Sequence, residues 1–168
     1  MNNGLEKIVV NCGVGRLATS NAHFEEKMLP EILSEFKAIV GQQPTIRKAK
    51  ASIAGFKLRQ GTIVGMNATL RGQRMKDFLA RLGSIVLPRV RDFRGIDPKN
   101  IDTNGNLTIG VKEHTAFPEI LPENSHVDFG LEVTMVPQLR GRNKGDAKEF
   151  YETLGIPFKK EKAPAVKK

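Results

Sequence analysis

The chain has 168 residues, a hydrophobic fraction of 39% and a formal net charge of +9. This length fits a single compact domain, and the hydrophobic content excludes wholesale disorder. We expect a cytoplasmic protein with no membrane association, because no apolar run could span a bilayer, no export signal opens the sequence, and Cys12 has no second cysteine with which to form an internal disulfide.

The positive charge is concentrated in the middle of the chain. Residues 47–94 carry twelve basic and two acidic side chains, a net charge of +10. Residues 1–46 have a net charge of −1, and residues 95–168 have none. Such a density of like charge indicates a polyanionic partner, either nucleic acid or an anionic membrane surface. The alternative is a solvated basic face that serves only solubility.

The N-terminal part of the chain predicts a strand followed by a helix. Side chains alternate over residues 5–12, which places Ile8, Val10 and Cys12 on one face of a strand. Apolar residues at spacings of three and four then predict a helix over residues 28–40.

This helix has recognisable end signals. We expect Ser20 or Asn21 to cap its start and Gly41 to end it. Pro30 lies within the apolar stripe, so the helix either begins there or is kinked there.

The middle of the chain predicts two strands separated by a basic loop. Residues 42–49 form an extended stretch with Ile46 facing inward. Residues 50–61 have neither a helical nor a strand period, and we expect a long, mobile loop. Residues 63–71 alternate again and predict a strand.

The second half of the chain predicts a helix, two strands and a last short helix. Pro88 follows the apolar stripe of the first of these helices, and residues 89–95 form a second basic loop. Residues 106–112 and 129–136 alternate as strands. The apolar stripes of the two helices are Met75, Phe78, Leu79, Leu82, Ile85 and Val86, and then Ala147, Phe150, Tyr151 and Leu154.

The order of these elements predicts an α+β fold. We expect a mainly antiparallel open sheet with helices packed on one face, an exposed polar and basic opposite face, and two basic loops. One domain should cover residues 1–158, followed by a basic, disordered tail over residues 159–168.

The exposed face of the predicted sheet is the main functional inference. Its side chains are cations that can neutralise phosphates, and amides and hydroxyls that can bond to sugars and bases. An ordinary solvated face would also carry several carboxylates, and here only Glu132 occurs. The outward residues are Lys7, Asn11, Thr45, Arg47, Asn67, Thr69, Arg71, Thr108, Lys112 and Thr134.

Residues 13–18, Gly-Val-Gly-Arg-Leu-Ala, match the dinucleotide-binding pattern G-x-G-x-x-A directly after a predicted strand. A dinucleotide-binding unit needs a helix that opens at the glycines and an acidic residue at the end of the next strand. Here residues 19–21 look like a loop, and Glu31 and Glu35 fall inside a helix. We therefore expect a tight turn.

No pattern in the sequence predicts catalysis, a cofactor or a metal. Cys12 falls on the core face, where a buried structural thiol is expected. His23, His114 and His126 lie in separate segments without ligand spacing, and neither a P-loop nor a G-x-S-x-G motif occurs. We predict that the protein is not an enzyme.

Aromatic residues narrow the kind of nucleic acid. The outward positions carry none, which disfavours stacking of unpaired bases and favours docking on structured RNA. Phe56 and Phe93 lie between charges in the two basic loops. Phe56 could contact nucleic acid, or either residue could anchor its loop to the core.

Several stretches of the chain, from Leu5 to Phe158, resemble the bacterial ribosomal protein L5 family. These stretches are LEKIVVNCGVG (5–15), GQQPTIRKAKASIAGFKLRQG (41–61), TLRGQRM (69–75), LPRVRDFRGI (87–96), GNLTIGVKEHTAFPEI (105–120) and LGIPF (154–158).

This resemblance implies an open antiparallel sheet in the central protuberance of the large ribosomal subunit. The exposed sheet face of the family binds 5S rRNA and links it to 23S rRNA beside neighbouring large-subunit proteins. The family's contact positions correspond here to Asn11, Gln42, Arg47, Thr69 and Arg71, and the outward list adds Lys7, Thr45, Asn67 and Lys112.

The resemblance also implies two contacts made by loops. The family's basic loop reaches the P-site tRNA, and an intersubunit bridge joins the family to a small-subunit head protein. We expect the bridge in loops of the second half of the chain. The residues that correspond to the basic loop, 50–59, include Lys50, Ser52, Phe56, Lys57 and Arg59.

Two features depart from the family pattern. Members usually carry an N-terminal helical segment before the first strand, whereas this sequence starts almost at the strand. Arg47 stands where the family commonly has Thr, which exchanges a hydroxyl contact for a phosphate contact. The basic middle alone would also allow a second function, that of a non-ribosomal RNA chaperone or architectural nucleic-acid-binding protein.

Overall fold

The computed structural model describes residues 4–138 and 144–159 of the chain. Five strands form one open sheet in the order β2-β3-β1-β5-β4, and every neighbouring pair is antiparallel. The predicted α+β class with an antiparallel open sheet is confirmed. The strands are β1 (Leu5–Gly13), β2 (Thr45–Lys48), β3 (Ile63–Leu70), β4 (Leu107–Val111) and β5 (Leu131–Pro137).

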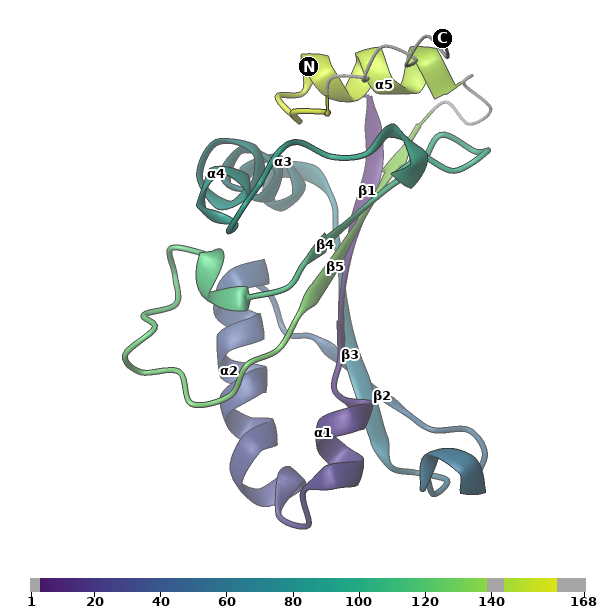
Figure 1. Cartoon of the computed structure of the whole chain (residues 1–168), viewed down its shortest axis with the longest axis vertical. Coiled ribbons are helices and arrows are strands. Elements are labelled where there is room, and N and C mark those ends of the chain that lie inside the picture. Colours follow the sequence, from purple (N-terminus) through teal and green to yellow (C-terminus); the bar gives the residue numbers. More distant parts are fainter. Residues whose placement is uncertain (1–3, 139–143, 160–168) are drawn as a thin grey trace, which may run out of the picture.

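Helices α2, α3 and α4 lie along one side of the sheet, and α5 crosses one end of it (Figure 1). The α-helices are α1 (Gly15–Ser20), α2 (Leu29–Val40), α3 (Gly72–Arg81), α4 (Leu87–Arg89) and α5 (Lys144–Thr153). Two π-helical turns, Phe24–Met28 and Leu82–Val86, join α1 to α2 and α3 to α4. Short 3-10 turns occur at Ala54–Phe56, Pro98–Asn100 and His114–Ala116.

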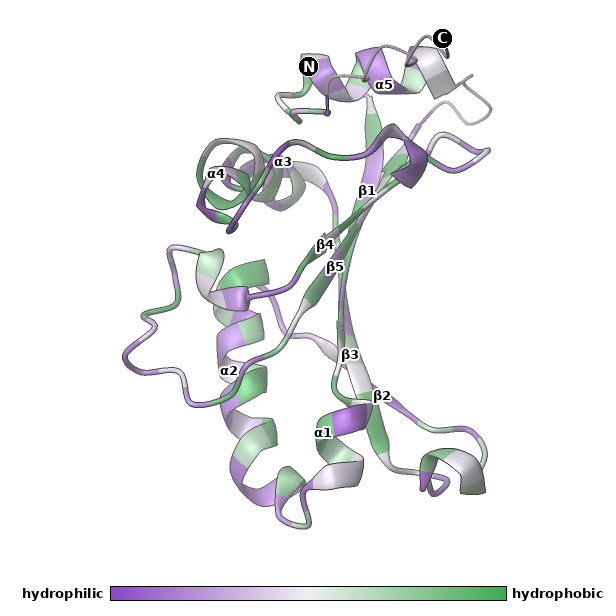
Figure 2. Cartoon of the chain, in the orientation of Figure 1, coloured by the Kyte–Doolittle hydropathy of each residue, from purple (hydrophilic) through white to green (hydrophobic). Residues whose placement is uncertain are grey.

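The core lies between the sheet and these helices. Ile8 and Val10 of β1 are buried, as are Ile32 and Phe36 of α2 and Phe78 of α3. Burial of each such side chain contributes about 2 kcal/mol to the hydrophobic stabilisation. Hydrophobic and hydrophilic residues alternate along the strands (Figure 2), as expected when one face of a sheet is covered and the other is open.

The ends of helix α2 are set by Pro30 and Gly41. Pro30 lies in the first turn of α2, where its missing N–H costs nothing, and α2 begins at Leu29, directly after the π-helical turn Phe24–Met28. Gly41 ends the helix in the left-handed conformation, with φ of 71°. The predicted capping by Ser20 or Asn21 is wrong, because both side chains bond back to the carbonyl of Leu17 in α1.

The turn predicted after β1 is in fact a helix. Helix α1 opens at Gly15 and includes residues 19 and 20, which the sequence suggested were a loop. A dinucleotide unit still does not form, because β1 pairs only with antiparallel neighbours and such a unit requires parallel strands.

Other predicted elements differ in their boundaries or exposure. The strand predicted over residues 129–136 begins later, at Leu131, although Phe129 is buried. Pro88 lies inside α4 rather than after a helix. Ile46 and Ile85 were placed on the inward side, yet each remains 38% exposed. Ile46 belongs to the edge strand β2. This strand has a neighbour on one side only, so its side chains are partly uncovered.

Phe158 and Lys159 pair with the chain just after the second basic loop. The backbone of Phe158 pairs with Ile96 in a parallel bridge, and the amide of Lys159 donates to the carbonyl of Ile96 at 2.9 Å. Lys159 therefore belongs to the folded part of the chain, contrary to the tail predicted from residue 159. The remainder of that predicted tail, residues 160–168, lies outside the described residues.

Candidate nucleic-acid interface

The outer face of the sheet, meaning the face opposite the helices, presents polar side chains in rows that cross the strands. In one row Thr45 of β2 lies opposite Asn67 of β3, which lies opposite Asn11 of β1. Asn11 in turn lies opposite Glu132 of β5, and Glu132 opposite Gly110 of β4. The row combines hydroxyl, amide and carboxylate groups on one surface.

A second row carries hydroxyl groups around an apolar centre. Thr69 lies opposite Val9, Val9 opposite Thr134, and Thr134 opposite Thr108. The two hydroxyls of Thr108 and Thr134 lie 3.3 Å apart and share a hydrogen bond. Hydroxyls that both donate and accept are suited to sugar and phosphate oxygens.

Gln42 joins this face from outside the strands. It precedes β2, which begins only at Thr45, so the expected position at the start of the strand is wrong. Its Nε2 donates to the carbonyl of Thr69 at 3.1 Å. This hydrogen bond holds the amide oxygen of Gln42 beside Thr69 on β3.

Arg47 is oriented across the sheet by its neighbour. Its Nε donates to Oδ1 of Asn67 at 3.2 Å, and the side chain is otherwise exposed. The guanidinium therefore lies over β3 rather than pointing away from the sheet edge. This arrangement pre-orients a planar cation that can bond to a phosphate through its two terminal nitrogens.

Arg71 and Lys7 supply positive charge at the far end of the outer face. Arg71 follows β3 in an extended conformation, with φ of −139° and ψ of 164°, and is exposed. Lys7 is half-buried and pairs with Glu6 at 3.3 Å. Arg71 is therefore the cation better placed to meet a phosphate.

The predicted loop over residues 50–61 is a structured hairpin that continues β2 and β3. Ile53 and Leu58 exchange backbone hydrogen bonds of 2.9 and 3.1 Å, and the amide of Gln60 donates to Oγ of Ser52 at 2.9 Å. Lys57 adopts the left-handed conformation, with φ of 52°, at the end of the tip. Figure 1 shows this hairpin projecting from the sheet.

The hairpin presents its residues to solvent rather than to the core. Phe56 is 74% exposed, and Lys50, Lys57 and Arg59 are exposed as well. Phe56 therefore does not anchor its loop. Phe93, in the second basic loop, is half-buried and packs against the core, so the anchoring interpretation holds for Phe93.

The structure divides the basic middle of the chain into separate groups. Arg47 and Arg71 flank the outer face, the hairpin carries the three cations Lys50, Lys57 and Arg59, and Arg89, Arg91 and Arg94 lie near the end of α4. Not every cation is available to a partner. Arg81 pairs with Glu119 and donates to the carbonyl of Ile39 at 3.3 Å, so it ties α3 to α2 and to the loop after β4.

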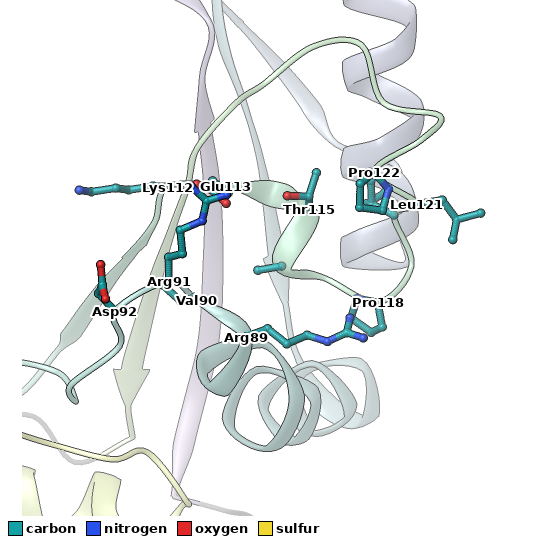
Figure 3. Close-up of a pocket in the computed structure, with 12 residues that line it drawn as sticks. Arg89, Val90, Arg91, Asp92, Lys112, Glu113, Thr115, Pro118, Leu121 and Pro122 are labelled. Carbon is teal, nitrogen blue, oxygen red and sulfur yellow. The ribbon is translucent and has the colours of Figure 1, made fainter.

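A hollow lies beside this third group. It has a volume of about 770 Å³, and its lining includes Arg89 and Arg91 together with Glu113, Pro118 and Leu121 of the loop after β4 (Figure 3). Lys112 lies at its rim and follows β4 on the outer side of the sheet. The strands β2 and β4 form opposite edges of the sheet. Lys112 therefore does not form one cationic patch with Arg47 and Arg71.

A buried histidine cluster escaped the sequence analysis. His114 is fully buried, with Nε2 3.0 Å from Oε2 of Glu35 and 2.9 Å from Oγ of Ser125. Its ring stacks on Phe129 with centroids 3.9 Å apart. The cluster ties the loop between β4 and β5 to α2, on the helical side of the sheet. No sequence spacing could have signalled it, because its members come from distant segments.

The described residues provide no metal site and no membrane span. Within residues 4–138 and 144–159, no group of three or more His, Cys, Asp or Glu side chains could hold a metal ion. No helix in the same part of the chain is both long and apolar enough to cross a membrane. Cys12 is buried on the core face, as predicted, and burial raises the pKa of its thiol to about 12.

Comparison with known proteins gives the class to which this fold and this polar face belong. Residues 3–59 match the family described as ribosomal protein L5, and residues 63–158 match the ribosomal L5P family C-terminus. The large ribosomal subunit protein uL5 of Lacticaseibacillus casei (strain BL23) is 49% identical over 156 residues, which cover 93% of this chain and 83% of that protein. The uL5 of Halothermothrix orenii is 40% identical over 154 residues, 92% of this chain and 82% of that protein.

The chain belongs to the ribosomal protein L5 family. It is a structural constituent of the large ribosomal subunit, with ribosomal RNA and ribosomal proteins as its partners and the cytoplasmic ribosome as its location. Members of this family are structural components, which agrees with the prediction that the chain is not an enzyme.

Proposed function

We propose that the outer face of the sheet binds 5S rRNA and attaches it to the central protuberance, where it is linked to 23S rRNA. The observation that carries this proposal is the common placement of Asn11, Thr69, Arg47 and Arg71 on one uncovered surface. Gln42, held against Thr69, extends the same surface. The mixture of cations and neutral hydrogen-bonding groups suits an RNA helix, whose phosphates and 2′-hydroxyls line its accessible minor groove.

Asn67, Thr45, Lys7 and Lys112 have supporting parts in this interface. Asn67 orients Arg47, and Thr45 lies next to it in the same row. Lys7 and Lys112 add positive charge at the margins of the face, where the flanking phosphates of a docked helix would lie.

We further propose that the hairpin over residues 50–59 approaches the P-site tRNA. Exposed Lys50, Lys57 and Arg59 can meet phosphates, and exposed Phe56 can pack on a ribose or a base. Ser52 acts within the hairpin, because its hydroxyl accepts from the amide of Gln60.

The intersubunit bridge is proposed for the loop between β4 and β5. In this loop Leu121 is 62% exposed, which is unusual for a large apolar residue and suits contact with a protein. The partner would be a protein of the small-subunit head.

A filter-binding series with 5S rRNA, tRNA and random RNA of equal length tests the main proposal. We expect at least a tenfold preference for 5S rRNA near physiological salt, because sequence-independent phosphate attraction is the same for all three and only specific docking adds to it. A smaller preference would instead favour a general RNA chaperone.

The hairpin is tested separately with Phe56→Ala in reconstituted ribosomes. We expect weaker P-site tRNA binding, about five- to tenfold if Phe56 packs on a base, and unchanged 5S rRNA binding, because Phe56 lies away from the outer face. Unchanged tRNA binding by the variant would remove Phe56 from the proposed contact.

A further inference from the structure

A groove floored by glycines crosses the outer face between β1, β5 and β4. It has a volume of about 360 Å³, and the polar side chains of its lining belong to Asn11, Lys112 and Glu132. Val111, Leu131 and three glycines, Gly13, Gly110 and Gly130, line the remainder. Gly13 and Gly110 occupy outward positions of their strands. The groove exists because these two residues have no side chains to fill it.

Two of the glycines of this groove, Gly13 and Gly110, are not explained by the backbone, whereas a Cβ added at Gly130 would lie 3.3 Å from the carbonyl oxygen of Val111. Neither Gly13 nor Gly110 has a positive φ, and a Cβ added at either position would meet nothing within 4 Å. Glycine in a strand interior weakens the strand, because it loses more conformational freedom on folding and has no side chain to pack. Glycine in a strand marks a bulge, a tight bend or a place where a ligand or another backbone approaches closely, and the pairing of β4 with β5 is regular at Gly110.

The carboxylate of Glu132 indicates the chemistry of the molecule that approaches the groove. It is the exposed carboxylate in the rows of the outer face, and it makes no hydrogen bond or ion pair among the residues that the structure describes. An ionised carboxylate only accepts hydrogen bonds, so it repels phosphate and requires a donor. Asn11 lies directly opposite Glu132, and Gly110 leaves open space on its other side.

We propose that this groove receives the minor-groove edge of an RNA helix, with Glu132 accepting a hydrogen bond from a ribose 2′-hydroxyl. This inference rests on the proposed binding of 5S rRNA and adds a residue that tells RNA from DNA. The minor groove of an A-form helix is wide and shallow and displays 2′-hydroxyls, so it fits a flat surface with a shallow hollow. Lys112, at the end of the groove, is placed for the adjoining phosphate, and the amide of Asn11 can bond to the neighbouring ribose.

Two variants test the groove without disturbing the fold. Gly110→Val fills the groove with a side chain that finds open space and favours a strand, so its melting temperature should equal or exceed that of the wild type. Glu132→Gln keeps the shape and removes the charge. Matched controls are Gly145→Ala in α5, where an added Cβ also meets nothing within 4 Å, and Glu25→Gln, an exposed carboxylate on the helical side.

We expect Gly110→Val to weaken binding of 5S rRNA by about tenfold or more, which corresponds to the loss of one or two hydrogen-bonded contacts. Glu132→Gln should weaken 5S rRNA binding about fivefold while binding of random RNA stays equal or becomes tighter, because a repulsive charge has been removed. The same variant should also reduce the ratio of two affinities, that for an RNA duplex from 5S rRNA and that for a DNA duplex of the same sequence. Both controls should bind as the wild type does.

The outcomes separate this inference from the function on which it rests. A wild-type protein without preference for 5S rRNA would overturn both. A wild-type protein that prefers 5S rRNA, together with variants that bind equally well, would overturn the groove alone. Weaker binding by Glu132→Gln with an unchanged RNA-to-DNA preference would overturn the assignment of the 2′-hydroxyl.

Discussion

Single residues on the outer face differ in how far the fold prepares them for a partner. Arg47 is held over the sheet by Asn67, and Gln42 is held against Thr69. Arg71 is exposed, and its side chain does not cap α3. A side chain that contributes little to stability can be removed without changing the fold, so Arg71 gives the clearest test of the interface.

Arg71→Ala should weaken 5S rRNA binding by about 1–3 kcal/mol, the usual cost of losing one arginine contact to nucleic acid. The free energy of unfolding should change by less than about 0.5 kcal/mol, as for most exposed positions. Filter binding and urea denaturation measure the two effects. Lys37→Ala, which removes an exposed cation from α2 on the helical side, is the control. Equal binding by the wild type and Arg71→Ala would exclude Arg71 from the site.

Cys12 should resist thiol reagents in the folded protein. Burial raises its pKa to about 12, so at pH 8 only about one thiol in ten thousand is ionised, and the thiolate is the reactive form. The thiolate fraction stays small as pH rises until the pH approaches 12. We expect no reaction with Ellman's reagent at pH 8 in buffer and one equivalent after unfolding in guanidinium. Rapid labelling of the native protein would contradict the burial of this residue.

At the scale of elements, long-range polar contacts hold the loops to the helices. The loop between β4 and β5 is tied to α2 by His114 and Glu35 and to α3 by Glu119 and Arg81. The amide of Phe129 donates to Nδ1 of His114 at 3.5 Å, while Nε2 shares a hydrogen bond with Oγ of Ser125 and lies 3.0 Å from Oε2 of Glu35. The loop proposed for the intersubunit bridge is thereby held in place by buried contacts.

His114→Ala should lower the free energy of unfolding by about 2–4 kcal/mol, because it leaves a cavity beside Phe129 and removes the partner of a nearly buried carboxylate. Urea denaturation measures this loss. His126→Ala, which alters an exposed histidine of the same loop, should change stability by less than about 0.5 kcal/mol. Similar stability of the two variants would mean that the His114 cluster does not fasten the loop.

At the scale of the whole molecule, the fold separates cations for binding from cations for stability. Arg47 and Arg71 are exposed on the outer face, whereas Arg81 is paired within the fold. The double variant Arg47→Ala/Arg71→Ala should reduce the salt dependence of 5S rRNA binding by about two phosphate contacts. Arg81→Ala should leave that dependence unchanged and lower thermal stability. If Arg81→Ala also reduced the dependence of the binding constant on salt concentration, Arg81 would belong to the RNA interface.

The sequence by itself determined the class of the fold and the composition of its outer face. Alternation in β1 and β3 and the apolar stripe of α2 follow from local backbone geometry, since a strand repeats every two residues and a helix every 3.6. The outward phase of Asn11, Thr69 and Arg71 could therefore be derived without coordinates, and the structure places them on one face.

Only the tertiary structure decided which distant residues meet. The bond from Gln42 to Thr69, the burial of His114 against Glu35, and the groove between Gly13 and Gly110 each depend on strands or loops from separate parts of the chain. Helix α1 and the ordered hairpin also depend on neighbours, because short segments are stabilised by packing and hydrogen bonding more than by their own propensity. Local periodicity carries no information on such pairings, since it records the face of an element and not the identity of its partner.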